Sequence, residues 1–206
     1  MSTLLLTSSG KFILNNELPF TKPLQQMKIG YVNTASKVIA DDSYSLEKQQ
    51  KMREGNYQYE IIDIAGKSEA ELRNFFKNKD VIYVEGGNTF YLLKCVRESG
   101  FDKIVKDLLK QNVIYIGSSA GSVVAGPDIY PTYMLDRAEQ APNLKGYQGL
   151  GLTDILVFPH WGTERFRERY LPQRMEHAFT PNHKIVLLTD SQYLKIQDQN
   201  INFVQI

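Results

Sequence analysis

The chain has 206 residues, of which 42% are hydrophobic and 23% charged, and its formal net charge at pH 7 is +1. This length suits one α/β domain over residues 1–206 and is ample for a full hydrophobic core. A charge so close to zero argues against nucleic acid as a partner, and no apolar run approaches the roughly 20 residues that cross a bilayer. The single cysteine, Cys95, leaves neither a disulfide framework nor a cysteine zinc site available. The start of the chain lacks a secretory signal, so the cytoplasm is the expected location.

Short β-branched runs alternate with longer helical runs along the chain, which predicts a mostly parallel sheet flanked by helices. Strands are expected at residues 4–7, 28–33, 59–64, 80–84, 113–116, 155–158 and 184–188. Helices are expected at residues 45–54, 68–77, 89–99 and 101–111. Two final β-rich runs, 193–196 and 201–204, predict a terminal hairpin. The irregular region 127–149 is a natural wall for a site, because loops that follow strand-helix units carry function.

The most informative motif directly follows the predicted strand at 113–116. Gly117-Ser-Ser-Ala-Gly121 has the G-x-S-x-G pattern of a nucleophile elbow, with Ser119 at its centre. The glycines permit a tight strand-to-helix turn that exposes the serine hydroxyl, and the helix N-terminus behind it offers free N–H groups. The pattern therefore predicts Ser119 as a nucleophile.

A serine hydroxyl needs a base, and usually an acid that orients the base. His160 follows an apolar strand and Pro159, which puts it at a strand's carboxyl end, where ligands bind in open α/β sheets. If the chain order is serine, acid, histidine, the acid lies between Ser119 and His160. Asp136 is the favoured acid and Glu139 the alternative, both in the irregular region.

A second glycine turn, Glu85-Gly-Gly-Asn-Thr89, follows the apolar strand at 80–84. Adjacent glycines at a strand end expose backbone N–H groups and let another chain or a ligand come close. One such N–H could pair with that of Ala120 to form an oxyanion hole. The alternative is a plain helix N-cap turn with Asn88 or Thr89 as the cap, and the two roles are compatible. Phosphate binding is disfavoured, because the chain has neither a Walker lysine nor a three-glycine dinucleotide fingerprint.

Three motifs together resemble peptidase E, the family of cytoplasmic aspartyl dipeptidases and their relatives, including the cyanophycinases. They are Gly86-Gly-Asn-Thr-Phe90, Gly117-Ser-Ser-Ala-Gly121 with the trailing Ala125-Gly-Pro127, and Phe158-Pro-His160. The resemblance implies a three-layer sandwich similar to class I glutamine amidotransferases (flavodoxin-like), with a serine in place of their cysteine.

For the site, the resemblance implies Ser119 as nucleophile and His160 as general base. It also implies an oxyanion hole from the N–H groups of Gly87 and Ala120, with Asn88 near the substrate. The family's aspartyl dipeptidases hydrolyse short peptides with an N-terminal aspartate and need no metal or other cofactor. An aspartyl side chain calls for a cationic partner, for which Arg165 is the nearest counterpart.

The sequence thus predicts a serine-dependent hydrolase of short peptides, acting as a monomer or a homodimer. An esterase, or another small-amide hydrolase, is the alternative with the same chemistry. A non-catalytic protein that binds a carboxylate or a peptide at the same glycine turn is the alternative from a different class.

Overall fold

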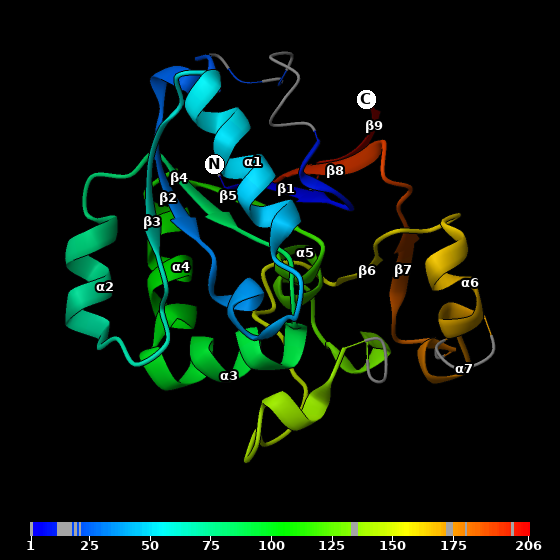
Figure 1. The fold of residues 1–206 in the computed structure, drawn as a ribbon. Helices are drawn as coiled ribbons and strands as arrows, with labels where there is room; N and C mark the ends of the chain where they lie inside the picture. The colour runs from blue at the N-terminus through cyan, green and yellow to red at the C-terminus, as the bar shows by residue number, and fades with distance from the viewer. Residues whose placement is uncertain are drawn as a thin grey trace.

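The computed structural model describes residues 2–11, 18, 20, 22–132, 136–171, 175–179, 181–198 and 200–206. Its centre is a seven-stranded sheet with the strand order β3-β2-β4-β5-β1-β8-β9 (Figure 1). The strands are β1 (Thr3–Thr7), β2 (Lys28–Val32), β3 (Gln58–Ile62), β4 (Val81–Val84), β5 (Ile114–Ser118), β8 (Gln192–Gln197) and β9 (Asn200–Gln205). The first five are parallel, whereas β8 runs antiparallel to β1 and to β9. The predicted sheet and terminal hairpin are confirmed.

Helices cover both faces of this sheet. They are α1 (Ser43–Glu54), α2 (Glu69–Phe76), α3 (Thr89–Ser99), α4 (Phe101–Lys110) and α5 (Ala120–Ala125). Two further helices, α6 (Glu164–Tyr170) and α7 (Met175–Ala178), pack against residues 155–158 and 184–187 instead. Side chains alternate across a strand, so Leu4 and Leu6 of β1 pack into the core with α2 to α5, while Leu5 packs on the other face with Met52 of α1. The result is three layers, helices–sheet–helices (Figure 1).

Two predicted strands leave the main sheet. The strands β6 (Ile155–Phe158) and β7 (Lys184–Leu187) pair with each other in parallel and form a separate small sheet beside α6. Ile155 and Val157 face the main core, whereas Leu156 and Phe158 pack with Tyr170 of α6. A strand buried on both faces is apolar throughout, so its sequence does not reveal which sheet it joins.

A polar network holds α1 against the sheet. The buried positions of this helix (Ser45, Lys48, Gln49 and Met52) follow helical spacing, but only Met52 is apolar. Glu85, 1% exposed at the end of β4, accepts hydrogen bonds from the Ser45 hydroxyl (2.7 Å), the Lys48 ammonium (3.2 Å) and the Tyr31 hydroxyl. Burial, together with the charge of Glu85, raises the pKa of Tyr31, so its hydroxyl stays a donor. The network ties α1 to the residue that precedes the Gly86-Gly87 turn.

Candidate active site

The predicted elbow forms between β5 and α5. Ser119 sits at φ 48° and ψ −108°, a sparsely populated conformation for a residue with a side chain, and its N–H donates to the Thr7 carbonyl at 3.0 Å. A Cβ at Gly121 would lie 2.2 Å from the Val84 carbonyl oxygen, and one at Gly117 would lie 2.6 Å from the Gly121 carbonyl. Both glycines of the motif are therefore required by close backbone approach.

The serine hydroxyl contacts a histidine, and the histidine contacts a carboxylate. Ser119 Oγ lies 2.9 Å from His160 Nε2, and His160 Nδ1 lies 2.7 Å from Asp190 Oδ1. His160 follows β6 and Asp190 follows β7, so the main sheet supplies the serine and the small sheet supplies its two partners. This is the hydrogen-bond order that a serine nucleophile needs.

The choice of Asp136, or of Glu139, as the partner of His160 is corrected by this geometry. Asp136 Oδ2 instead accepts from the Thr89 N–H at 2.7 Å, at the start of α3, and burial raises the pKa of this carboxyl. Glu139 is exposed on a short 3-10 helix, η5 (Ala138–Gln140). The carboxylate that contacts His160 is Asp190, which comes after the histidine in the chain because it follows β7, at the same end of the small sheet.

Two serines that follow β1 hold Asp190 in place. The Ser8 hydroxyl donates to Asp190 Oδ1 at 2.6 Å, and its oxygen accepts the His160 backbone N–H at 2.6 Å. The Ser9 hydroxyl donates to the Asp190 carbonyl at 2.8 Å. Hydrogen bonds from His160 and then Ser8 lower the pKa of Asp190 against the opposing effect of burial. The sequence analysis missed Ser8, Ser9 and Asp190, although all three lie just past strand ends, where parallel strands gather functional groups.

The lowered pKa of Asp190 predicts a pH-dependent contribution to stability. An aspartate in an unfolded chain titrates near about pH 3.9, and the folded pKa lies lower. The stabilisation is therefore complete above about pH 4 and is lost as the pH falls through the folded pKa. We expect the difference in thermal midpoint between the native protein and Asp190→Asn to be largest near neutral pH and to shrink below about pH 4. A difference that stays constant in thermal scans across this range would contradict the assignment.

The Gly86-Gly87 turn lies against the nucleophile. A Cβ at Gly86 would be 3.0 Å from Ser119 Cβ. Gly87 has φ 144°, and a Cβ there would be 2.1 Å from the Ala35 carbonyl oxygen, so only glycine fits. The turn thus brings half-buried backbone next to the serine hydroxyl.

Asn88, predicted to lie near the substrate, is engaged inside the protein. Its side-chain oxygen accepts the Tyr91 N–H at 2.9 Å and so caps α3. Its amide nitrogen donates to the Arg137 carbonyl and to Gln140 Oε1, both at 2.8 Å. The plain N-cap role weighed for this residue is the one the geometry supports.

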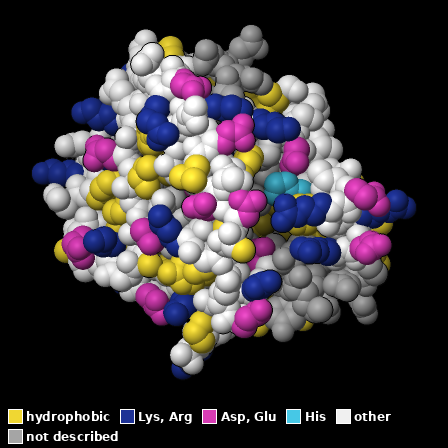
Figure 2. Space-filling view, in the orientation of Figure 1, with side chains coloured by type: hydrophobic (Ala, Val, Ile, Leu, Met, Phe, Trp, Pro, Cys, Tyr) yellow, Lys and Arg dark blue, Asp and Glu magenta, His cyan; other side chains and the backbone are white. Residues whose placement is uncertain are grey.

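Arg165, predicted to bind an aspartyl side chain, is exposed on α6. Its guanidinium carbon lies 5.5 Å from the centre of the Phe166 ring, and Phe166 stacks on the His160 ring at 4.8 Å with an interplanar angle of 13°. Figure 2 shows Lys and Arg side chains close to an exposed histidine on this face. The Phe166 ring therefore lies between the Arg165 guanidinium and the His160 imidazole.

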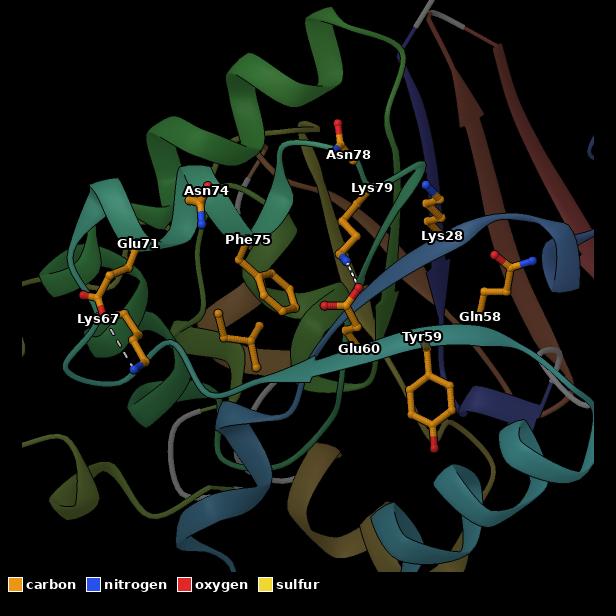
Figure 3. Close-up of a pocket in the computed structure, with 11 residues that line it drawn as sticks. Lys28, Gln58, Tyr59, Glu60, Lys67, Glu71, Asn74, Phe75, Asn78 and Lys79 are labelled. Carbon is orange, nitrogen blue, oxygen red and sulfur yellow. Dashed lines mark hydrogen bonds and ion pairs between the residues drawn. The ribbon is translucent and has the colours of Figure 1, made fainter.

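A surface depression lies away from Ser119 and His160, at the β3 edge of the main sheet. It has a volume of about 710 Å³ and is lined by residues of β3, α2 and the segments around them. Figure 3 shows Lys79 reaching Glu60 and Lys67 reaching Glu71, so these lysines meet carboxylates of the same depression. It holds no hydroxyl-imidazole pair, and we do not assign it a role.

The rest of the described chain offers few other reactive groups. Cys95 is buried in α3, and burial raises the pKa of its thiol to about 11, so it is a poor nucleophile at neutral pH. No cluster of three or more His, Cys, Asp or Glu side chains that could hold a metal ion occurs among the described residues. None of the helices within the described ranges is long and apolar enough to span a membrane.

The site consists of a serine on a strand-to-helix turn, hydrogen-bonded to a histidine that is in turn hydrogen-bonded to an aspartate. This arrangement, at the carboxyl ends of the strands of an α/β fold, is that of a serine hydrolase. Comparison with known proteins narrows this class. The chain matches the model of Peptidase family S51 over residues 4–204. It belongs to that family, and it is a serine-type peptidase.

Individual relatives agree with this assignment. The chain is 30% identical to an uncharacterized peptidase of Listeria monocytogenes, over 98% of this chain and 97% of the relative. It is 26% identical to the peptidase E of a Nostoc species, over 86% and 72% of the two chains. Among solved structures, a candidate peptidase E from Listeria monocytogenes superposes with a TM-score of 0.90 at 29% identity, covering 100% of this chain and 99% of the other. A peptidase from an acI-B1 actinobacterium shares the fold, with a TM-score of 0.71 at 16% identity over 100% and 88% of the two chains.

Proposed function

We propose that this peptidase is a serine-dependent dipeptidase of the aspartyl dipeptidase type. The observation that carries the proposal is the hydrogen-bond chain from Ser119 through His160 to Asp190. In this proposal Ser119 is the nucleophile, His160 the general base and Asp190 the acid that orients it. No metal is required by these steps.

The reaction proceeds in two halves. His160 Nε2 takes the Ser119 proton as Oγ attacks the scissile carbonyl carbon, while Asp190 holds the imidazole through Nδ1. His160 then gives that proton to the leaving nitrogen, the C–N bond breaks and an acyl-enzyme ester remains. In the second half, His160 takes a proton from a water molecule as the water oxygen attacks the ester carbonyl carbon. The ester C–O bond then breaks, His160 gives the proton to Ser119 Oγ, and the acyl product leaves as a carboxylic acid.

The oxyanion formed in each half needs hydrogen-bond donors. The N–H of Ala120 lies in the first turn of α5, where N–H groups have no partner within the helix. The turn at Gly87 supplies half-buried backbone next to Ser119, which packs against Gly86. We assign the oxyanion hole to these two N–H groups, each worth roughly 3 kcal/mol of transition-state stabilisation in known hydrolases.

Preference for an N-terminal aspartate requires a cation, and Arg165 is our candidate. Its guanidinium lies over the Phe166 ring, which in turn stacks on the His160 ring. Region 127–149, of which residues 133–135 lie outside the described ranges, and the segment at Trp161 are proposed to restrict access to short peptides. Esterase activity and simple ligand binding remain the alternatives to be tested.

The decisive experiment compares the native protein with Ser119→Ala on Asp-Leu, Ala-Leu and a matched Asp ester, without added metal. Cleavage of Asp-Leu that needs Ser119 supports the dipeptidase, and serine-dependent cleavage of Ala-Leu alone supports the mechanism but not the specificity. Preference for the ester with no amide cleavage favours an esterase. If none of the three substrates is cleaved and a fluorophosphonate does not label Ser119, the proposed function is wrong and a binding role takes its place.

A further inference from the structure

A pocket lined mainly by aromatic and aliphatic side chains opens directly beside His160. It starts at His160, follows the chain through Gly162, and ends on α6, with a volume of about 280 Å³. Its apolar lining comes from Trp161, Phe166, Tyr170 and Leu171. We propose that this pocket binds an apolar side chain on the leaving-group residue of the substrate. The proposal rests on the proposed function and adds a second specificity site to it.

The direction follows from the proton transfer. His160 Nε2 is 2.9 Å from Ser119 Oγ, and the same nitrogen must reach the leaving amine to protonate it. In the proposed mechanism the oxyanion is bound by the N–H groups of Gly87 and Ala120, on the side of the Gly86-Gly87 turn that packs on Ser119. The residue attached to the leaving nitrogen therefore extends past the His160 ring, into the pocket that begins there.

The shape and chemistry of the pocket suit one hydrophobic residue. Ligand pockets for drug-sized molecules are roughly 300–1,000 Å³, so 280 Å³ is suited to a single side chain rather than an extended peptide. Its rings are held in place, because Phe166 stacks on His160 and lies 5.9 Å from Tyr170, which is 2% exposed. The charged groups in the lining, Glu164 and Arg167, lie 3.6 Å apart and are largely exposed, which leaves the interior to the rings.

The test keeps the acyl residue constant and varies the leaving residue. For the native protein, kcat/KM is expected to be at least about tenfold higher for Asp-Leu and Asp-Phe than for Asp-Ala and Asp-Lys, because burial of a large apolar side chain favours the first two. Trp161→Ala is expected to reduce this ratio by about tenfold while Asp-Ala cleavage changes little.

Leu171→Ala provides the same test with less risk to folding, since Leu171 is 53% exposed. We expect a smaller fall in the Leu-to-Ala ratio for this variant. The matched control is Leu46→Ala, because Leu46 is 56% exposed on α1 and lies outside the pocket lining, and it should leave the ratio unchanged. Equal ratios in the native protein and both pocket variants would overturn the proposal.

A second readout probes the pocket from the reverse direction. An added amine can replace water in the second half-reaction: its nitrogen attacks the acyl-enzyme carbonyl, the ester C–O bond breaks, and the amine proton passes through His160 to Ser119 Oγ. Leucinamide is expected to divert more acyl-enzyme to the new amide than alaninamide at equal concentration, and Trp161→Ala should remove the difference. Active enzyme that captures both amines equally disproves the pocket assignment alone, whereas absence of any acyl-enzyme disproves the proposed function.

Discussion

Replacement of Asp190 by asparagine is expected to lower kcat by about 10⁴-fold without unfolding the protein. An asparagine amide can donate to His160 Nδ1, which leaves the ring proton on Nε2 and prevents that nitrogen from taking the Ser119 proton. The Ser9 hydroxyl keeps its acceptor, because that acceptor is the backbone carbonyl of residue 190. The Ser8 hydroxyl donates to the same Oδ1 that contacts His160, so in the variant it faces the amide nitrogen and has to accept a hydrogen bond from it. Steady-state kinetics on the best dipeptide, with Ser119→Ala as a reference expected to lose about 10⁶-fold, would measure the effect.

Asp136→Asn is the matched control for this prediction. Asp136 is a carboxylate of the same type, but its oxygen caps the Thr89 N–H, and an asparagine oxygen can accept that bond equally well. We expect kcat to stay within about threefold of the native value, because the variant changes no hydrogen bond of His160. If Asp136→Asn lost activity while Asp190→Asn kept it, the triad would have to be reassigned.

Lys48→Met is expected to destabilise the protein by about 3–5 kcal/mol. Lys48 and Glu85 are both buried, so removal of the ammonium leaves a carboxylate inside the protein without its cation. The cost reflects the desolvated charge that remains, not the strength of the pair itself. Denaturant unfolding monitored by circular dichroism would give the change in free energy.

Two further variants separate this mechanism from simple loss of packing. Lys51→Met on the same helix removes a cation from an exposed pair with Glu47 (2.8 Å) and is expected to change stability by less than about 1 kcal/mol. Adding Glu85→Gln to Lys48→Met should recover part of the lost stability, because the uncompensated charge is then absent. A double variant less stable than Lys48→Met would show that the carboxylate is not the source of the cost.

Many helix and strand ends of this fold can be predicted from the residues directly around them. Strand β5 and the start of α5 were predictable because Gly117 and Gly121 mark a turn that no other residue type fits. Helix α3 was predicted with its observed bounds, since Asn88 provides the N-cap and Gly100, at φ 73°, ends the helix in the left-handed conformation. Helix α2 likewise lies within its predicted range of 68–77, and a capping box formed by Ser68 and Glu71 fixes its start.

Asp190 was not predictable in the same way as the hydrogen-bond partner of His160. Nothing within a few residues of Asp190 distinguishes it from other carboxylates, and its partners Ser8 and His160 are 182 and 30 residues away in the chain. Its place depends on β6 and β7 leaving the main sheet together, which the apolar pattern of these strands does not encode. The buried polar network that holds α1 against the sheet was not predictable for a related reason. In the sequence, Glu85 and Lys48 look like ordinary surface charges.

Trp161, the single tryptophan of the chain, directly follows His160. Its backbone N–H donates to the carbonyl of Leu188, just past the end of β7, at 3.0 Å. Because the nucleophile belongs to one sheet and its partners to the other, the hydroxyl-imidazole bond exists only while the two sheets are seated together. The protein therefore carries an intrinsic fluorophore on the small sheet, one residue from the imidazole on which the proposed chemistry depends. Indole emission, followed during mild denaturation alongside turnover, reports whether the packing of the small sheet beside His160 persists when activity is lost.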